Sequence, residues 1–467
     1  MVHYDATKCH VDAEVIITTA VASTWTVAPA LPLQEHRLPL SNLDLLLPPI
    51  DVGVFFCYAS GNGNDDDVPS ALALKAALAK VLVPYYPLAG EVVATAAGEP
   101  ELLCSGRGVD FTEATAAGAE LRQVRLSMPD ESADKLVPAK KSGVMSVQFT
   151  KFKCGGAVVG CVFDHRVCDA YSFNMFLVAW ANAARGGSSS VSPAPSFDRS
   201  FLAPRNGISS SVDTLADRLF VPVSRVPPPS TSAAPAAATE AFNRIYHVSA
   251  ADVAALQAAA GPGRTKLEAF TAHLWQLYAM AADTSDRRPS CRVSMGVVVD
   301  GRSRLRPDGA MGAYFGNVLT IPYGILGAGD LRGMALADVA ADVHGWVSEA
   351  ASGERFRGLV EWVEAHRPEP TVARAYLGAG ESDSMVCVVS SGMRLPVGEV
   401  DFGTGRPAFA SYHFPWPGGA GYVMPMPSAR AGSGDWVVYV HAAPELVRAM
   451  EQEPTVFRAP DGRRIFG

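Results

Sequence analysis

His165 and Asp169 stand in the segment with the clearest chemical character, VVGCVFDHRVCDAY at 158–171. An apolar run ends at Phe163, which predicts a buried strand, and His165 follows in the turn. A strand end holds a side chain rigidly, while the open turn leaves it accessible to a substrate. Histidine suits proton transfer because its ordinary pKa lies near neutrality. His165 is therefore a candidate general base.

The same two residues have ordinary structural interpretations, and the segment alone does not decide between them. Asp169 lies just before a predicted helix that begins near Ala170, so its carboxylate can cap that helix. His165 can be a hydrogen-bonded turn histidine. A motif as short as HxxxD also arises by chance in a chain of this length.

Thiol or serine nucleophiles have weaker support. Cys161 falls inside the predicted strand, where a buried thiol is expected, and Cys168 lies within the motif. No GxSxG segment is present to carry a nucleophilic serine. The eight cysteines form no CxxC pair and no metal-ligand spacing. We expect reduced thiols in the cytoplasm, and no metal site.

The elements that position these residues follow from length and pattern. A chain of 467 residues predicts two domains. Residues 186–240 are rich in Gly, Ser, Pro and Ala, which predicts a crossover loop between domains at 1–185 and 241–467. Helices are predicted at 70–82, 171–184, 250–260, 265–281 and 336–352, and strands at 144–152, 157–163, 293–299, 385–389 and 436–441. The mixture indicates an α/β fold with a sheet in each domain.

Charge and hydropathy exclude some classes of function. The net charge is −8 and no dense Lys/Arg cluster occurs, so neither nucleic acid nor an anionic membrane surface is an expected partner. No apolar run reaches the roughly 18 residues that a membrane helix needs. Thr265 and Lys266 open a predicted helix, whose N-terminus either binds a phosphate or is simply capped and solvated.

Five motif blocks give the chain a resemblance to the plant BAHD acyltransferase family along nearly its whole length. HRVCD is similar to the family's HxxxD motif, and DFGTG resembles its DFGWG motif. The remaining blocks occur in the family's order, and they are YYPLAG at 85–90, DGRSR at 300–304 and YFGN at 314–317. The segment LPLSNLDLLLPPIDVGVFF looks closest to coniferyl alcohol acyltransferases.

The resemblance implies two similar mixed-sheet α/β domains, as in chloramphenicol acetyltransferase, with a channel between them. Acyl-CoA, a co-substrate rather than a permanently bound cofactor, would enter from one face and the acceptor from the other. His165 would take the acceptor's proton, the acceptor would attack the thioester, and no acyl-enzyme would form. A monomer is expected.

The resemblance also implies residue roles. Asp169 would orient the catalytic loop by pairing with an arginine, for which Arg302 is preferred to Arg304. Asp401 would be structural or a second proton acceptor. Ser390 would be an oxyanion donor. Four residues would contribute to the coenzyme A side, namely Thr265, Lys266, Gly403 and Gly405.

Three positions depart from the family pattern. Ala170 replaces the common glycine, Thr404 replaces the tryptophan of DFGWG, and Gly392 stands where a tryptophan donates near the oxyanion. Losing one oxyanion donor costs on the order of 10²-fold in rate. A backbone N–H replaces the missing donor at Gly392, or catalysis is slower, or the pocket is reshaped.

Three functions follow as hypotheses. The first is transfer of an acyl group, acetyl or hydroxycinnamoyl, to the hydroxyl of a small plant metabolite. The second is N-acylation of an amine or polyamine, which an acidic pocket would favour. The third is a BAHD-like binding protein with little catalysis, which the altered motifs motivate and the intact His165 and Asp169 oppose.

Overall fold

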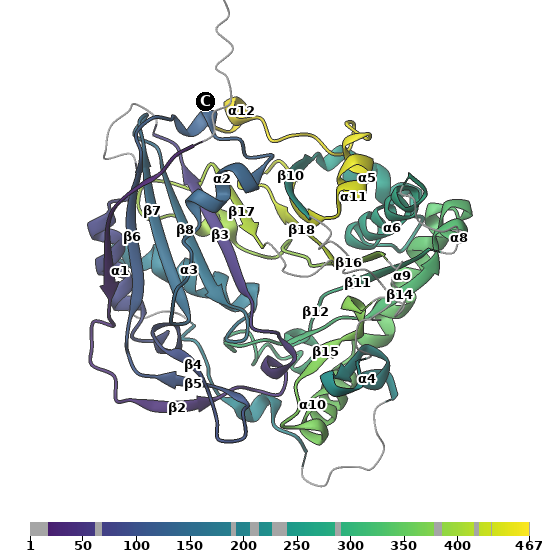
Figure 1. Ribbon diagram of the computed structural model, residues 1–467, viewed down its shortest axis with the longest axis horizontal. Coiled ribbons are helices and arrows are strands. Elements are labelled where there is room, and N and C mark those ends of the chain that lie inside the picture. Colours follow the sequence, from purple (N-terminus) through teal and green to yellow (C-terminus); the bar gives the residue numbers. More distant parts are fainter. Residues whose placement is uncertain are drawn as a thin grey trace, which may run out of the picture.

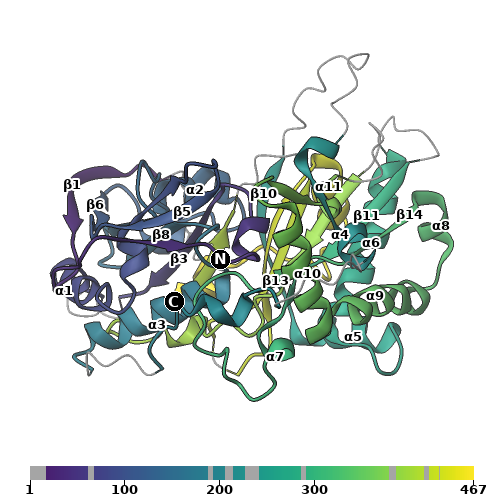
Figure 2. The same cartoon turned by 90° about the horizontal axis from the view of Figure 1, so that it is seen from below.

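Two six-stranded mixed sheets lie side by side in the computed structural model (Figures 1 and 2). The structure describes residues 17–60, 68–187, 193–205, 214–226, 241–284, 291–377, 385–414, 420–430 and 432–466. Parts of the predicted crossover, including 227–240, lie outside the described residues. The predicted mixed α/β fold with two sheets is confirmed.

The first sheet has the order β1-β6-β7-β8-β3-β17. Only β6 and β7 pair in parallel. All residues of β8 are buried, which explains its unbroken apolar run. Its hairpin with β7 turns at Gly155, whose φ of 81° suits glycine. The strands are β1 (Ala20–Val27), β3 (Asp51–Tyr58), β6 (Val109–Ala116), β7 (Met145–Phe152), β8 (Ala157–Asp164) and β17 (Phe409–His413).

The second sheet has the order β10-β19-β18-β16-β11-β14, with β16 parallel to both of its neighbours. Its strands are β10 (Phe242–Val248), β11 (Arg292–Val297), β14 (Tyr323–Gly327), β16 (Met385–Val389), β18 (Gly421–Pro427) and β19 (Trp436–Ala442). Three smaller sheets pair β2 (His36–Pro39), β5 (Pro100–Cys104) and β4 (Glu91–Ala94); β9 (Phe220–Pro222) and β15 (Thr371–Ala373); and β12 (Val299–Asp300) and β13 (Leu319–Thr320).

Helices pack with both sheets. Helices α1 (Ala71–Val81) and α3 (Ala170–Ala184) contact each other beside the first sheet, and α2 (Pro129–Leu136) bridges β7 and β8 to β10. Helix α6 (Lys266–Thr284) is central to the second half, where it contacts α5 (Ala250–Ala259), α8 (Ala328–Gly333), α9 (Leu336–Ala350) and α11 (Pro444–Glu451). The remaining helices are α4 (Thr214–Leu219), α7 (Arg302–Leu305), α10 (Gly353–His366) and α12 (Gly462–Phe466).

Strand β17 comes from the C-terminal half of the chain but belongs to the first sheet. It pairs antiparallel with β3, beside which its yellow-green ribbon lies in Figure 1. The segment that leads into it buries Leu395, Val400 and Phe402 in the first hydrophobic core. The first sheet therefore contains a strand from beyond residue 240, so the two sheets do not correspond to two continuous halves of the chain.

Gly160 provides a test of this packing, because β8 carries the His165 turn. A Cβ at Gly160 would lie 2.0 Å from the carbonyl oxygen of Leu136, at the end of α2. We expect Gly160→Ala to lower the free energy of unfolding by about 2–3 kcal/mol, as overpacked sites do. Gly118→Ala is the control, since its Cβ would meet nothing within 4 Å. Equal urea denaturation midpoints for the two variants would contradict the prediction.

Candidate active site

His165 lies in the turn that follows β8, where it lines a cavity of about 720 Å³ between the sheets. Its backbone N–H donates to the carbonyl oxygen of Ile50 over 2.9 Å, just before β3. The rings of Phe163 and Phe414 flank the imidazole, each with its centroid 6.4 Å away. Nδ1 is buried without a hydrogen-bond partner among the described residues. Nε2 is therefore the nitrogen left to meet a substrate.

Asn317 holds the His165 turn from the second half of the chain. Its side-chain amide donates to the carbonyl oxygens of His165 at 2.9 Å and Arg166 at 3.4 Å. The same amide and its backbone N–H donate to Asp44, whose carboxylate is fully buried. Ser41 adds two further bonds to Asp44. These hydrogen bonds fix the backbone of the turn, and none of them involves the imidazole ring of His165.

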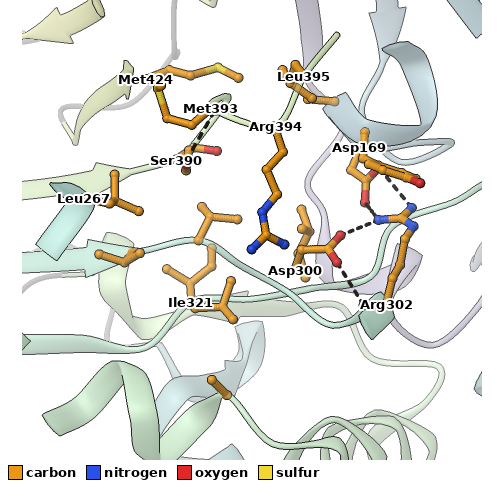
Figure 3. Close-up of a pocket in the computed structure, with 18 of the residues that line it drawn as sticks. Asp169, Leu267, Asp300, Arg302, Ile321, Ser390, Met393, Arg394, Leu395 and Met424 are labelled. Carbon is orange, nitrogen blue, oxygen red and sulfur yellow. Dashed lines mark hydrogen bonds and ion pairs between the residues drawn. The ribbon is translucent and has the colours of Figure 1, made fainter. Parts of the chain in front are cut away.

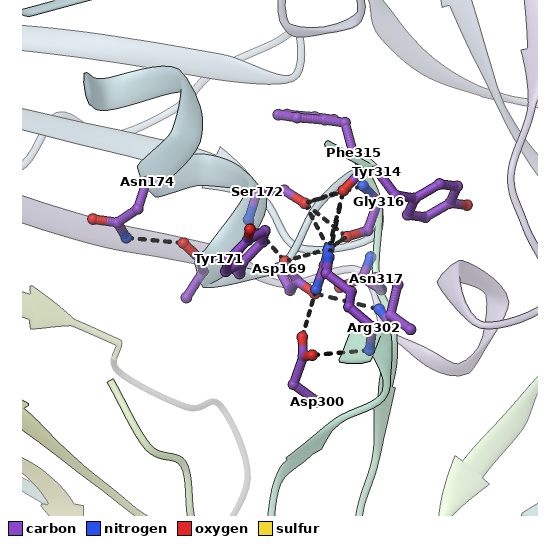
Figure 4. A network of polar contacts seen from close by, with 12 residues as sticks. Asp169, Tyr171, Ser172, Asn174, Asp300, Arg302, Tyr314, Phe315, Gly316 and Asn317 are labelled. Carbon is purple, nitrogen blue, oxygen red and sulfur yellow. Dashed lines mark hydrogen bonds and ion pairs between the residues drawn. The ribbon is translucent and has the colours of Figure 1, made fainter. Parts of the chain in front are cut away.

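Asp169 is buried and points into a polar network with Arg302 and Ser172 (Figure 4). One carboxylate oxygen accepts from the backbone N–H of Ser172 at 2.9 Å, which caps α3. Arg302 donates to both oxygens, at 2.8 and 3.1 Å. Asp169 therefore caps the helix and pairs with Arg302 at the same time.

Arg302, on α7, is the arginine that meets Asp169, whereas Arg304 donates to backbone carbonyl oxygens instead. The Arg302 guanidinium also binds Asp300 at 2.6 Å and the hydroxyl of Ser172 at 2.8 Å. Burial alone would lower the pKa of Arg302, but Asp169 and Asp300 outweigh it and raise that pKa. Burial also raises the pKa of Asp300, against the opposing charge of Arg302.

Ser390 lines the cavity at the end of β16. Tyr422 also lines the cavity, where its hydroxyl donates to the sulfur of Met424 at 3.8 Å, and burial raises the pKa of its phenol to about 12. Sequence reasoning missed Tyr422, because a tyrosine inside β18 looks like an ordinary strand residue.

Gly392 offers no replacement oxyanion donor. Its backbone N–H donates to the carbonyl oxygen of Pro425 over 2.9 Å, so the expectation that this group substitutes for the missing indole is wrong. A Cβ there would lie 2.6 Å from Met426 and 3.0 Å from Met424. The two methionines occupy the volume where a side chain would begin, and Met424 lines the cavity in its place.

Thr265 and Lys266 are exposed at the start of α6, and Thr265 lines the cavity. Thr265 and Glu268 cap the helix reciprocally, with bonds of 2.7 and 3.2 Å. Burial would raise the pKa of Glu268, but its bonds to Thr265 and His344 outweigh burial and lower it. Both earlier alternatives, a capped helix start and a phosphate site at the cavity, are compatible with this placement.

The DFGTG segment lies apart from the cavity lining and shapes its own loop. Asp401 accepts from the backbone N–H groups of Gly403 at 2.8 Å and Gly405 at 3.0 Å. These glycines have φ values of 109° and 102°, in the region that favours glycine. The Arg185 guanidinium, at the end of α3, donates to the Asp401 carbonyl oxygen. None of these groups belongs to the lining of the cavity that His165 lines.

The two cysteines near His165 are buried thiols. Burial raises the pKa of Cys161 and raises that of Cys168 well above its ordinary value. Both therefore stay protonated and are poor nucleophiles. Within the described residues, no group of His, Cys, Asp and Glu could hold a metal ion, and no helix is long and apolar enough to cross a membrane.

Comparisons with known proteins agree with this geometry. The model of the Transferase family matches residues 17–456. A hydroxycinnamoyl-CoA:5-hydroxyanthranilate N-hydroxycinnamoyltransferase from Avena sativa is 30% identical, over 86% of this chain and 91% of its own. Putrescine hydroxycinnamoyltransferase 1 from Oryza sativa subsp. japonica is 31% identical, over 91% and 95%. The crystal structure of vinorine synthase has a TM-score of 0.68 at 21% identity, covering 95% of this chain and all of the other.

The Asp169–Arg302 pair can be tested by unfolding. Asp169→Ala leaves the buried guanidinium with Asp300 as its one carboxylate among the described residues, and we expect a loss of about 3–5 kcal/mol in urea denaturation. Asp169→Asn keeps a capping side chain, so it should recover only about 1 kcal/mol of that loss. Asp308→Ala, which removes the exposed partner of Arg306, is the control and should change little. A loss below about 1 kcal/mol for Asp169→Ala would contradict the assigned pairing.

Proposed function

We propose that this chain, which belongs to the BAHD transferase family and is an acyl-CoA-dependent acyltransferase, uses His165 as its general base. The observation that carries the proposal is the position of His165. Its imidazole lines the cavity between the sheets, while its turn is held by Ile50 and Asn317. A base must stand at the reacting centre and stay in place, and this arrangement supports both.

The proposed reaction proceeds in two steps. His165 takes the proton of the acceptor hydroxyl as the oxygen attacks the thioester carbonyl carbon. The resulting tetrahedral oxyanion then collapses, the carbon–sulfur bond breaks, and the imidazolium returns its proton to the coenzyme A thiolate. A thioester is already activated, so no enzyme nucleophile is required, in keeping with the buried thiols of Cys161 and Cys168.

Asp169 is proposed as a positioning residue. Its carboxylate is occupied by Arg302, Ser172 and the backbone N–H of Val318, none of which is part of the imidazole. It therefore acts through the shape of the loop rather than through the proton. Asp401 is proposed as structural on the same grounds, since its carboxylate closes its own loop with Gly403 and Gly405.

Ser390 and Tyr422 are the proposed oxyanion donors. Both line the cavity. The hydroxyl of either residue can donate a hydrogen bond to the developing charge. Such donors, fixed before reaction, stabilise a tetrahedral intermediate most effectively. Gly392 contributes neither a side chain nor a free N–H.

Coenzyme A is proposed to lie with its phosphates near the start of α6. The first-turn N–H groups and the exposed Lys266 suit an anion. Thr265 and Leu267 continue from there along the cavity lining. Gly403 and Gly405 lie outside this lining, and they are proposed to shape the coenzyme A side through the backbone of their own loop.

The acyl donor is proposed to be a hydroxycinnamoyl thioester. The relatives from Avena sativa and Oryza sativa are hydroxycinnamoyltransferases by name. The cavity volume of about 720 Å³ also suits an aromatic acyl group. Its apolar lining is supplied by aliphatic and aromatic side chains from both halves, among them Leu46, Ile50, Phe220, Tyr376 and Phe414.

The acceptor is proposed to be a small alcohol. A polyamine would require free carboxylates in the cavity, but Asp169 and Asp300 bind Arg302, and Glu268 binds His344. The alternative is an uncharged aryl amine, which the N-acyltransferase from Avena sativa makes relevant. The described cysteines are all free thiols, which supports the cytoplasm as the proposed location, and we propose a monomer.

Replacement of His165 tests the proposed base. We expect His165→Ala to reduce acceptor-dependent thiol release by at least about 10³-fold, because general-base catalysis contributes about 10²–10⁴-fold. Release is followed with a thiol reagent, using p-coumaroyl-CoA and acetyl-CoA against panels of alcohols and amines.

Cys168→Ala is the matched control from the same motif, and it should retain activity within a few-fold. Activity that survives in His165→Ala but disappears in Cys168→Ala would replace the base mechanism with a thiol mechanism. Absence of release by the wild type with every pair would favour the weakly catalytic binding protein.

Replacement of Ser390 tests the oxyanion assignment. We expect Ser390→Ala to lower kcat by about 10²-fold while leaving the KM for acyl-CoA near its wild-type value, because the lost bond forms in the transition state. Ser391→Ala is the control, since this neighbouring hydroxyl is exposed and also lines the cavity. Equal small effects of both substitutions would remove Ser390 from the oxyanion site.

A further inference from the structure

The cavity carries more positive charge than its carboxylates neutralise. Four arginines line it, namely Arg302, Arg304, Arg306 and Arg394. Arg302 is bound by Asp169 and Asp300, and Arg306 by Asp308. The remaining two have no carboxylate within ion-pair distance among the described residues. Two guanidinium groups without carboxylate partners in one cavity create a positive potential that attracts anions.

Arg394 extends from the loop after β16 into this space. Figure 3 shows its guanidinium on the cavity side of the loop, between Ser390 and Asp300. Asp300 does not neutralise it, because both Asp300 oxygens accept from Arg302. Both oxygens of the Asp300 carboxylate are thus already occupied.

Arg304 is the second member of the pair. Its guanidinium donates to the carbonyl oxygens of Ala351 and Asp300, and these bonds fix the side chain without cancelling its charge. Burial lowers the pKa of Arg304, the charge of Asp300 opposes that effect, and the charge of Arg394 adds a smaller lowering. Arg394 is therefore close enough for its charge to act on Arg304, and a bound anion would relieve that repulsion.

Arg394 also stands where two cavities meet. Together with Tyr171 and Gly312 it lines a second cavity, of about 830 Å³, whose other charged lining residues are Lys80, Arg185 and Glu399. An anionic group can therefore approach Arg394 from either side. A planar guanidinium binds carboxylate and phosphate oxygens through paired hydrogen bonds, whereas it offers nothing to a cationic acceptor.

We propose that Arg394 and Arg304 form an anion-binding subsite that holds an oxyanionic group of a substrate, either a carboxylate or a phosphate. The inference rests on the proposed function to the extent that substrates occupy this cavity. It extends that function by selecting acidic or neutral acceptors over polyamines. The carboxylate would belong to the acceptor or the acyl group, and the phosphate would belong to coenzyme A.

Equilibrium binding tests the subsite without turnover. Calorimetry compares two matched pairs of probes: 4-hydroxycinnamic acid with its methyl ester, and coenzyme A with pantetheine, which has no phosphate. We expect Arg394→Gln to weaken binding of one anionic probe about 10- to 100-fold, as loss of a charged hydrogen bond does. Binding of the uncharged probe of that pair should stay unchanged. Arg394→Lys should recover part of the loss.

The pair that responds identifies the source of the anion, carboxylate for the acid and phosphate for coenzyme A. Arg292→Gln, an exposed arginine at the start of β11, is the control and should change neither pair. The proposal is overturned if the wild type binds neither anion more tightly than its uncharged counterpart. It is also overturned if Arg394→Gln and Arg292→Gln behave alike. A wild type that binds the anions but releases no thiol would instead refute the catalytic proposal alone.

Discussion

The buried contact between Asp169 and Arg302 joins the parts of the chain on which the active site depends. The two residues lie 133 positions apart in the sequence, one at the start of α3 and the other on α7. A buried charge is costly unless it is paired and fully hydrogen-bonded. Arg302 meets that requirement with Asp169, Asp300 and the hydroxyl of Ser172, together with the carbonyl oxygen of Gly316. The two halves of the chain must therefore meet at the cavity in an orientation that lets Arg302 form these hydrogen bonds.

A second buried carboxylate, that of Asp44, supports the turn that carries His165. Asp44 is fully buried and saturated by Ser41 and Asn317, and Asn317 in turn holds the carbonyl oxygens of the turn. Two buried carboxylates thus fix the loop while leaving the imidazole free of acidic partners. This separates the site from a Ser-His-Asp arrangement, in which the carboxylate bonds to the imidazole itself.

Local sequence pattern predicted the elements near the site well, because each depends on its own residues. The hairpin of β7 and β8, the helix α3 and the strand β16 are set by apolar runs, glycines and caps that neighbours in sequence supply. The role of β17 was not predictable in this way. Phe409–His413 pairs with β3, more than 300 residues away, and an isolated five-residue strand carries no information about which sheet it joins.

The site residues also differ in whether the sequence alone could predict them. Asp169, Arg302 and Ser390 were predicted because their segments resemble motifs of the BAHD family. Tyr422 and Arg394 did not, because a tyrosine in a strand and an arginine in a loop are common, and only the folded cavity gives them a shared environment. The possibility that the backbone N–H of Gly392 donates to the oxyanion could not be judged from the sequence for a related reason. Whether a backbone N–H is free depends on its partner, here Pro425 of β18, which no local pattern specifies.

The substituted positions and the charge distribution together narrow what the cavity can accept. Met424 and Met426 fill the space that a side chain at 392 would enter, so flexible methionines stand where the family pattern has an indole. Across from it, the lining carboxylates are committed to Arg302 and His344, whereas Arg304 and Arg394 have no carboxylate partner within ion-pair distance in the described part of the chain. An adaptable apolar wall facing uncompensated positive charge favours an aromatic molecule with an acidic or neutral polar end. A cationic amine would lose its hydration in this cavity and gain no free carboxylate there, because Asp169 and Asp300 bind Arg302, and Glu268 binds His344.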